Sequence, residues 1–197
     1  MHPAPLLVLA STSRYRHELL QRLGLPFESH APEVDETPVA GEAAPERARR
    51  LAAAKARAVA ARWPEAVVIG SDQVASVEQG GDWEILRKPG TADRAQRQLA
   101  ALSGRAACFD TAACVVSPGL TQAHVDRTRV DFRALSAADI ARYIAREPAF
   151  DCAGGFKCEG LGVSLMQRLQ TEDPTALIGL PLIWLCEALR RAGLSVP

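Results

Sequence analysis

Two short apolar runs, each followed at once by polar residues, constrain the fold of this chain more than any other feature. Residues 5–10 (PLLVLA) and 66–70 (AVVIG) have the length of strands, and their apolar character is continuous rather than alternating. Such runs are typical of strands that are covered on both faces. Segments with helical periodicity lie between and after them, so strand and helix alternate in the first half of the chain. The sequence therefore predicts an α/β fold.

The second half of the chain adds a hairpin to this alternation. Two strand-like segments flank Ser117-Pro118-Gly119, a combination typical of a tight turn. A hairpin predicts a mixed sheet rather than a purely parallel one. The length of 197 residues suits one domain, residues 1–197. Cap residues and apolar spacing predict helices over about 14–23, 45–63, 91–102, 136–146 and 182–192, and strands over about 106–116, 122–133 and 161–170.

Charge and cysteine content exclude several classes of protein. The 23 lysines and arginines equal the 23 aspartates and glutamates, which argues against a partner such as a nucleic acid polymer or an anionic membrane. No apolar stretch reaches the roughly 20 residues that span a bilayer, and we expect the N-terminal run to be a core strand, not a signal peptide. The five cysteines form no C-x-x-C pair, so we expect reduced thiols in a cytoplasmic protein rather than a zinc site.

Candidate phosphate-binding groups follow the first strand. Ser13 and Arg16 lie where that strand leads into a helix, and a helix N-terminus favours an anion through its amides and dipole. Arginine adds a fork of donors that matches phosphate oxygens. Lys55 and Lys88 are the other candidate cations. The alternatives are helix capping for Ser13 and ordinary surface charge for the cations.

Candidate acids occur at two further places. Glu36 belongs to an acidic loop, residues 33–36, and clustered carboxylates in a loop can hold magnesium. Asp72 directly follows the second apolar run, a position that suits a metal ligand or a general base. A solvated acidic loop and a turn-forming aspartate are the alternatives.

Together these residues predict phosphoanhydride hydrolysis, in which positioning and charge neutralisation do most of the work. The chain has no P-loop motif, which excludes a P-loop enzyme, and no G-x-S-x-G elbow, which argues against an α/β-hydrolase. A glycine-rich stretch, residues 152–162 (CAGGFKCEGLG), also predicts a backbone that closely approaches another element or a ligand.

Eight short motifs follow one another along the chain: LASTSRYRHELLQRLG, PEVDET, LAAAKA, IGSDQV, KPG, LSGR, AGGFKCEGLG and IGLPL. In this order they resemble the Maf family of nucleotide pyrophosphatases. The resemblance extends from Leu6 to about Gly193 and is specific as an ordered set. It implies a Maf/ITPase-like α/β fold: an elongated mixed β-sheet flanked by helices, with two lobes and a deep cleft, and a possible homodimer.

The resemblance also implies roles for individual residues. It implies that the substrate is a small nucleoside triphosphate and that the enzyme cleaves it between the α and β phosphates with a divalent metal cation, Mg or Mn. The resemblance assigns phosphate binding to Ser13, Arg16, Lys55 and Lys88. It assigns metal binding to Glu36 and Asp72, and it makes Asp72 the proton acceptor.

Three positions distinguish the branches of the family by base. Tyr15, Gln73 and Glu159 resemble the branch that prefers 7-methyl-GTP over the branch that prefers dTTP and UTP. A carboxylate at Glu159 can accept the two adjacent N–H donors of guanine. An aromatic ring at Tyr15 favours the cationic 7-methylated purine by about 0.5–2 kcal/mol. An ion pair with Lys157 is the alternative role for Glu159.

Some residues depart from the family pattern. This chain has Arg14 where the family often has proline, and Tyr15 where tryptophan is more usual. It also has Arg87 and Ala112 in place of glycines and Gly155 in place of a serine. The Tyr15 change bears on base stacking. Three other functions stay open: a dTTP/UTP pyrophosphatase, a broad house-cleaning pyrophosphatase for modified nucleotides, and a non-catalytic nucleotide-binding regulator of septum formation. The full set of candidate catalytic residues favours an active enzyme over the regulator.

Overall fold

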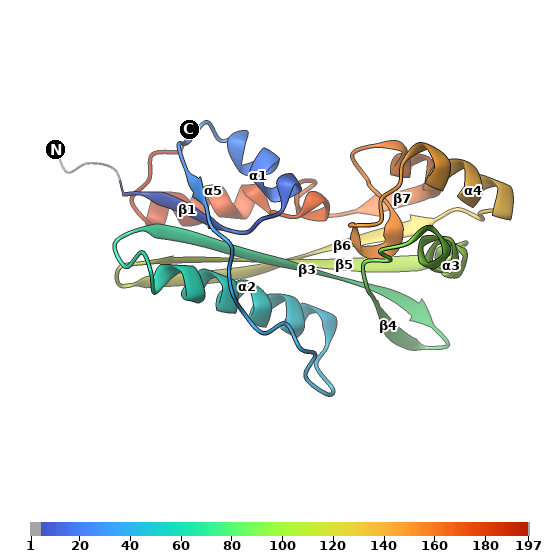
Figure 1. Cartoon of the computed structure of the whole chain (residues 1–197), viewed down its shortest axis with the longest axis horizontal. Coiled ribbons are helices and arrows are strands. Elements are labelled where there is room, and N and C mark those ends of the chain that lie inside the picture. The colour runs from blue at the N-terminus through green and yellow to red at the C-terminus, as the bar shows by residue number, and fades with distance from the viewer. Residues whose placement is uncertain (1–4, 197) are drawn as a thin grey trace. The chain divides into compact units, whose positions relative to one another are not determined.

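The computed structural model describes residues 5–196. The ends of the predicted domain, residues 1–4 and 197, lie outside this range. In the first half the elements are β1 (Leu7–Ala10), α1 (Arg14–Gln21), β2 (Glu28–Ser29), α2 (Ala44–Ala60), β3 (Val67–Gln79), β4 (Asp82–Leu86) and α3 (Ala92–Leu102). They continue with β5 (Ala106–Ser117), β6 (Leu120–Phe132), α4 (Ala137–Arg146), η1 (Ala153–Gly155), η2 (Leu161–Leu165), β7 (Met166–Gln170), η3 (Ala176–Ile178) and α5 (Leu182–Arg191), where η marks a 3₁₀ helix (Figure 1).

The strands form a mixed sheet, as predicted. In the described part of the chain it has seven strands in the order β2-β1-β3-β5-β6-β7, and β4 pairs with β3 outside this path. β1 is parallel to both β2 and β3, whereas β4 is antiparallel to β3 and β7 is antiparallel to β6. The predicted mixed α/β architecture is therefore confirmed.

The chain divides into two compact units, which we describe separately. Unit 1 comprises residues 1–72, 111–126 and 173–197, and unit 2 comprises residues 73–110 and 127–172. β3, β5 and β6 have residues in both units.

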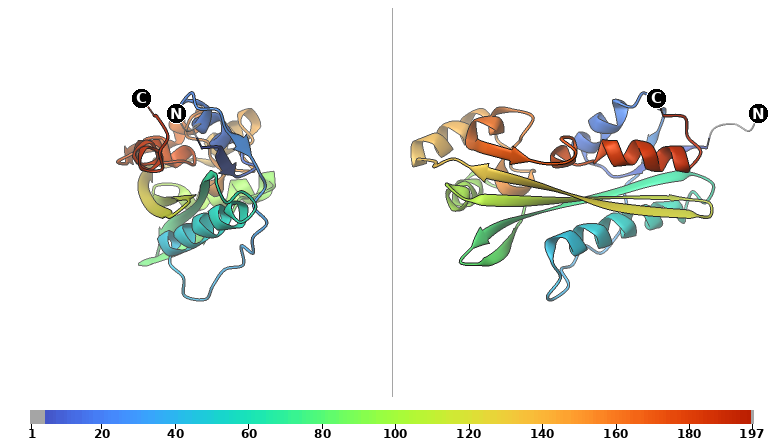
Figure 2. Two further views of the ribbon diagram at one scale, coloured as in Figure 1. Left: turned by 90° about the vertical axis from the view of Figure 1, so that its left-hand side faces the viewer. Right: turned by 180° about the vertical axis from the view of Figure 1, so that it is seen from behind.

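In unit 1, β1 and the start of β3 are buried on both faces, as expected, although the first strand begins at Leu7 and the preceding Leu6 is exposed. Leu7 and Leu9 of β1 pack with apolar residues of α1 and α5. Val8 and Ala10 point the other way and pack with Val59 of α2, because successive side chains of a strand alternate between faces. Figures 1 and 2 show α1 and α5 on one side of β1 and α2 on the other. This double cover explains why β1 has no polar position.

In unit 2, an aromatic cluster forms part of the core. The ring of Phe156 makes edge contacts with Phe109 and Phe132, at centroid distances of 5.3 and 5.2 Å. All three side chains are buried, and such pairs contribute about 0.5–1.5 kcal/mol beyond the apolar area that they bury. Phe156 thereby fixes the glycine-rich stretch to β5 and β6.

The structure corrects the predicted extent of several strands. β3 continues to Gln79, so Asp72 lies inside the strand and does not follow it. The residues from Val74 to Val77 are all buried, and this burial extends the strand beyond the apparent turn at residues 70–73. β2 and β4 were not predicted, and a 3₁₀ helix occupies the first half of the strand predicted at 161–170.

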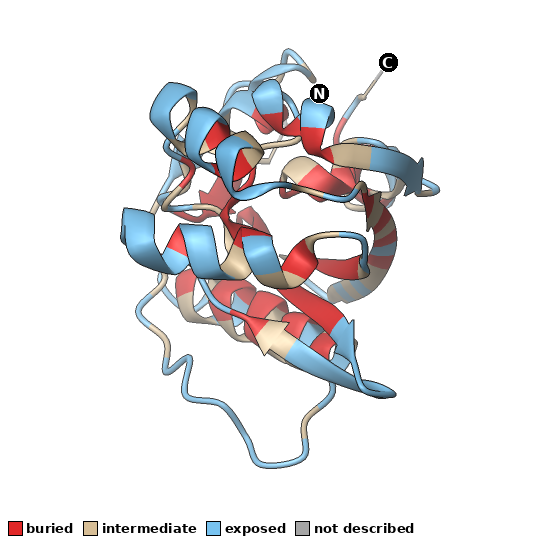
Figure 3. Cartoon of the chain, turned by 90° about the vertical axis from the view of Figure 1, so that its right-hand side faces the viewer, coloured by how far each residue is buried: buried red, intermediate tan, exposed pale blue. Residues whose placement is uncertain are grey.

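The helices agree more closely with the sequence, because their boundaries depend on local caps. α1 begins at Arg14 as expected, and α4 begins after Ser136, whose hydroxyl accepts the Asp139 amide. Figure 3 shows that buried residues face the sheet, whereas residues 31–43 are largely exposed. No helix within residues 5–196 is long and apolar enough to cross a bilayer.

Candidate active site

Gly70 allows helix α2 to approach strand β3 very closely. A Cβ atom added at Gly70 would overlap the Ala52 carbonyl and lie 2.5 Å from the Ala56 nitrogen. The buried face of α2 is correspondingly rich in alanine at helical spacing. Lys55 lies on this same face, so the close packing brings its side chain to the sheet.

Lys55 joins the two acids that the sequence singled out. Its Nζ lies 2.6 Å from Asp72 Oδ1 and 2.8 Å from Glu36 Oε1. The side chains of Lys55 and Asp72 are only 9% and 12% exposed, whereas that of Glu36 is 57% exposed. Charges removed from water interact more strongly with each other and lose hydration. The structure thus brings together three predicted residues and pairs each acid with the lysine.

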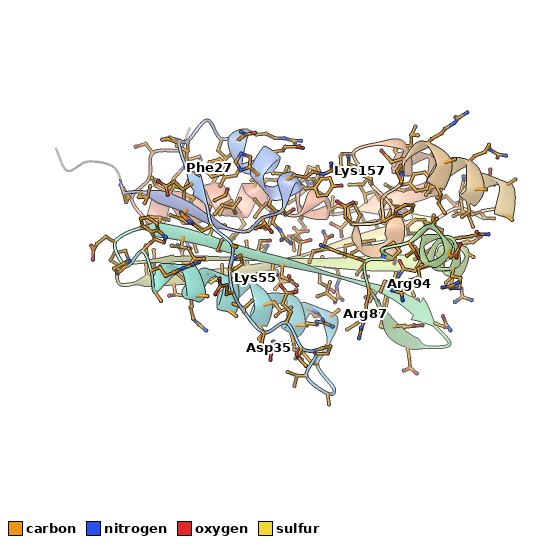
Figure 4. The ribbon with its side chains drawn as sticks, in the orientation of Figure 1. Phe27, Asp35, Lys55, Arg87, Arg94 and Lys157 are labelled. Carbon is orange, nitrogen blue, oxygen red and sulfur yellow. The ribbon has the colours of Figure 1, made fainter. Side chains whose placement is uncertain are left out.

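The loop that carries Glu36 is held against α2 by backbone contacts. Arg47, Arg50 and Arg62 of α2 or its C-terminal turn donate to the carbonyl oxygens of Glu36, Thr37 and Ala31, at 3.4, 3.3 and 2.9 Å. Figure 4 shows Lys55 on α2 beside the loop that contains Asp35. These arginines place the Glu36 carboxylate next to Lys55.

Asp35 stabilises the conformation of this loop. Its Oδ1 accepts the Thr37 amide at 2.8 Å and the Thr37 hydroxyl at 2.5 Å. These two hydrogen bonds, the hydroxyl first, hold the pKa of the Asp35 carboxyl below its ordinary value. Within the acidic loop, Asp35 therefore stabilises a turn, whereas Glu36, the predicted metal ligand, contacts Lys55.

Arg16 lies near the same acids and is oriented by a carbonyl. Its Nε donates to Gly179 O at 3.0 Å, and the buried Ser71 hydroxyl donates to the same oxygen at 2.9 Å. Burial lowers the pKa of the Arg16 guanidinium, while the charges of Asp72 and Glu36 act to raise it. The Arg16 guanidinium therefore lies within electrostatic reach of both acids, as a phosphate-binding cation beside a metal site would.

Gly179 is a site residue for which no role was predicted. It has a φ of 139°, and a Cβ there would lie 3.3 Å from Arg16 Cγ. The motif IGLPL contains Gly179 and forms part of the family resemblance, so a signal was present in the sequence. Its contact with Arg16 spans 163 residues and cannot be read from local pattern.

Ser13 and Tyr15 lie at the start of α1. Ser13 is the N-cap residue, but its hydroxyl makes no capping hydrogen bond within the described residues. Helix amides that lack a capping partner favour an anion, which agrees with the phosphate role predicted for Ser13. The Tyr15 ring has the Arg14 guanidinium 4.7 Å from its centroid, so a cation already covers one face of this ring.

In unit 2, the loop with Lys88 contacts the glycine-rich stretch. The Gly90 amide donates to Phe150 O at 3.0 Å. A Cβ at Gly155 would lie 3.5 Å from Pro89 Cγ. Gly155 has a φ of +71°, a conformation that strains any residue with a side chain. This backbone conformation explains the glycine where the family pattern has serine.

Glu159 lies on a tight turn of this glycine-rich stretch. Its Oε1 is 3.9 Å from Lys157 Nζ, and the Cys158 thiol donates to its Oε2 at 3.4 Å. Burial, followed by the charge of Glu159, raises the pKa of Cys158 to about 12. The thiol is therefore neutral at physiological pH, and thiolate chemistry is not favoured. The ion pair with Lys157 is long, so the carboxylate retains capacity to accept other donors.

The predicted residues thus fall into two groups. In unit 1 the structure brings Arg16, Lys55 and Asp72 together with Glu36. In unit 2 it links the Lys88 loop to the stretch that carries Glu159. Gln73 follows Asp72 directly in β3, and its side chain is partly exposed.

The site has two acids paired with a buried lysine, and an oriented arginine lies near them. These groups are typical of an enzyme that acts on phosphate groups. A mixed α/β fold carries them here. The chain belongs to the Maf family: the model described as "Maf-like protein" matches residues 6–192.

Full-length relatives agree with this membership. The chain is 54% identical to the 7-methyl-GTP pyrophosphatase of Xanthomonas oryzae pv. oryzae (strain MAFF 311018), over 98% of this chain and 100% of that protein. It is 51% identical to the protein of the same name from Aromatoleum aromaticum, over 97% of both chains. A solved structure, the Ham1 protein of Staphylococcus aureus, overlaps at a TM-score of 0.43 and 16% identity, covering 64% of this chain and 71% of that one. The predicted family is confirmed by the first two findings.

Proposed function

We propose that this chain is a nucleoside triphosphate pyrophosphatase that hydrolyses 7-methyl-GTP to 7-methyl-GMP and pyrophosphate. The observation that carries the proposal is the buried Lys55, which lies 2.6 Å from Asp72 and 2.8 Å from Glu36. Relatives of 50–54% identity that bear the name 7-methyl-GTP pyrophosphatase support the substrate.

Asp72 is the proposed general base. It accepts a proton from the attacking water as the water oxygen bonds to phosphorus, and the P–O bond to the leaving pyrophosphate breaks. Lys55 orients the Asp72 carboxylate through its Oδ1. Arg16, Lys88 and the Ser13 end of α1 are the proposed phosphate contacts, since guanidinium, ammonium and amide donors all match phosphate oxygens.

The two carboxylates also fit a divalent cation. Within residues 5–196 no cluster of three or more His, Cys, Asp or Glu side chains could hold a metal by itself. Magnesium, however, commonly binds through one or two carboxylates and completes its shell with water and substrate phosphates. Glu36 and Asp72 are the residues that would hold it. When bound, magnesium or manganese would neutralise charge on the phosphate oxygens.

Base selection is assigned to Tyr15, Gln73 and Glu159. The Glu159 carboxylate accepts the two N–H donors of the guanine edge, and Tyr15 offers its ring to the cationic purine. A pyrimidine lacks this pair of donors and would leave the carboxylate unsatisfied. A cytoplasmic location and a homodimer remain predictions.

The decisive experiment measures pyrophosphate release from 7-methyl-GTP, GTP, dTTP and UTP, first with magnesium and then with manganese. We expect the largest kcat/KM for 7-methyl-GTP with either metal. Preference for a pyrimidine would retain the reaction and reject the base assignment. Similar rates for several modified bases would indicate a house-cleaning enzyme, and binding without turnover would indicate a regulator.

A further inference from the structure

The turn that carries Glu159 is closed by the backbone of Lys157. The amides of Gly160 and Gly162 both donate to Lys157 O, at 3.2 and 3.1 Å. The bond from Gly160 makes a β-turn with Cys158 and Glu159 at its two central positions. The place of the Glu159 carboxylate therefore depends on where Lys157 and Gly162 are held.

Helix α4 holds both ends of this turn. The Tyr143 hydroxyl accepts the Lys157 amide at 2.9 Å, and Glu147 Oε2 accepts the Gly162 amide at 3.2 Å. Tyr143 and Glu147 are four residues apart, so their side chains leave the same face of the helix. Burial raises the pKa of the Tyr143 phenol, and the nearby Glu147 carboxylate adds to that rise. The two side chains together support the turn.

The glycines of the turn make this support possible. A Cβ at Gly160 would overlap the Glu147 carboxylate, and a Cβ at Gly162 would overlap the Lys157 carbonyl. Neither glycine has a positive φ, so backbone conformation alone does not require them. The close approach of Glu147 accounts for Gly160, and the closure of the turn accounts for Gly162.

The position of Glu147 is not explained by the stability of its own helix. Glu147 is the C-cap residue of α4, where the helix dipole disfavours a negative charge. Residues that break a local rule often serve a functional site. Its hydrogen bond to Gly162 supplies the reason for a carboxylate at this position.

We propose that Tyr143 and Glu147 are positioning residues that hold Glu159 for base reading and so set the preference of the enzyme for 7-methyl-GTP. The inference rests on the proposed function, in which Glu159 accepts the guanine N–H donors. A carboxylate that must meet two donors at once tolerates displacement of only about 0.5 Å. The proposed function assigns the hydrolytic step to Asp72 and Lys55, so the role of this pair is in base selection and not in hydrolysis.

The test compares kcat/KM for 7-methyl-GTP with kcat/KM for UTP in a set of variants. Tyr143→Phe keeps the buried ring but lacks the accepting oxygen, and Glu147→Ala removes the second acceptor. We expect each to lower the 7-methyl-GTP to UTP ratio by about tenfold, the effect of losing one well-placed hydrogen bond, with UTP turnover retained. Glu147→Gln keeps an accepting oxygen and should retain most of the ratio.

Asp139→Ala is the matched control, because it weakens the same helix at its N-terminal cap without touching the turn. We expect its ratio to equal that of the wild-type enzyme. An equal fall in Asp139→Ala would show that any loss of helix stability produces the effect, and would reject the proposal. An unchanged ratio in both Tyr143→Phe and Glu147→Ala would reject it as well.

A double-mutant cycle with Glu159→Gln separates this inference from the proposed function. If Glu147 acts through Glu159, adding Glu147→Ala to Glu159→Gln causes no further fall in the ratio. Additive losses would show that Glu147 acts elsewhere and would overturn the inference while the function stands. A wild-type enzyme without preference for 7-methyl-GTP would instead reject the substrate assignment, and with it the role of the pair.

Discussion

At the residue scale, the chemistry of this protein depends on buried charges that neutralise one another. Lys55 lies within an otherwise apolar helix face and contacts two acids from different parts of the chain. Removal of one member of such a group leaves an uncompensated charge, which commonly costs 3–5 kcal/mol. A change that preserves shape and hydrogen bonding is therefore the informative one.

Asp72→Asn is such a change. Asparagine retains an oxygen that accepts from Lys55, and Lys55 keeps its pair with Glu36, so we expect the protein to fold normally. Loss of the base should lower kcat by about 10²–10⁴-fold. Circular dichroism checks the fold, and pyrophosphate release checks the rate. A variant with near-normal turnover would reject the role of Asp72.

Arg14→Ala tests the cation that already covers Tyr15. Its guanidinium lies 4.7 Å from the ring centroid, so it competes with a cationic base for the same π system and also repels it. We expect the variant to raise the ratio of kcat/KM for 7-methyl-GTP over GTP by roughly two- to fivefold, as a cation–π contact of about 0.5–1 kcal/mol implies. A lower ratio would mean that Arg14 assists the stacking.

At the element scale, the close packing of helix α2 on strand β3 depends on one residue without a side chain, Gly70. Gly70 leaves no room for a Cβ beside Ala52 and Ala56, so the helix lies close enough for Lys55 to reach Asp72. The exposed loop before α2 is attached by arginines of that same helix and its C-terminal turn. The packing of two elements thus assembles three site residues.

Gly70→Ala should separate these elements. We expect a loss of about 1–3 kcal/mol in the free energy of unfolding, as for other overpacked sites, together with a large fall in kcat. Gly24→Ala is the control: it strains a positive φ of +68° but meets no atom within 4 Å. It should lower stability in urea without affecting kcat. If both variants keep full activity, the close approach is not needed for catalysis.

The N-terminal cap of α4 predicts a dependence of stability on pH. The Ser136 hydroxyl and amide, with Arg133, hold the pKa of the Asp139 carboxyl well below its usual value. A depressed pKa gives stability that is complete above the unfolded pKa of about 3.9 and is lost as pH falls toward the folded value. The difference in urea midpoint between wild type and Asp139→Asn should therefore shrink between pH 5 and pH 2. A constant difference would contradict this explanation.

At the scale of the whole molecule, each compact unit has its own core and its own set of candidate residues. Unit 1 contains the lysine and its two acids together with Arg16, and unit 2 contains Lys88 and the Glu159 turn. Lys55 pairs with both acids, and the positive charge of Arg16 also interacts with them, so the fold does not require a metal to offset their charge. Metal dependence should therefore appear in activity and not in folding.

Chelation provides the test. We expect EDTA to abolish pyrophosphate release and manganese or magnesium to restore it, with no change in the thermal unfolding midpoint. A large drop in that midpoint would indicate a structural cation. Persistent activity in EDTA would remove the metal from the proposed reaction.

The mixed α/β class, the five helices expected within the described residues and the Maf family could all be predicted from the sequence. Helix caps, apolar runs and ordered motifs are local signals, and local physics fixes them. Three features became visible only in the folded chain: β3 runs through Asp72, Lys55 joins Glu36 to Asp72, and the Gly179 carbonyl orients Arg16. These contacts join residues far apart in the chain. They form because buried polar groups need partners, and a local sequence pattern does not show which partners those are.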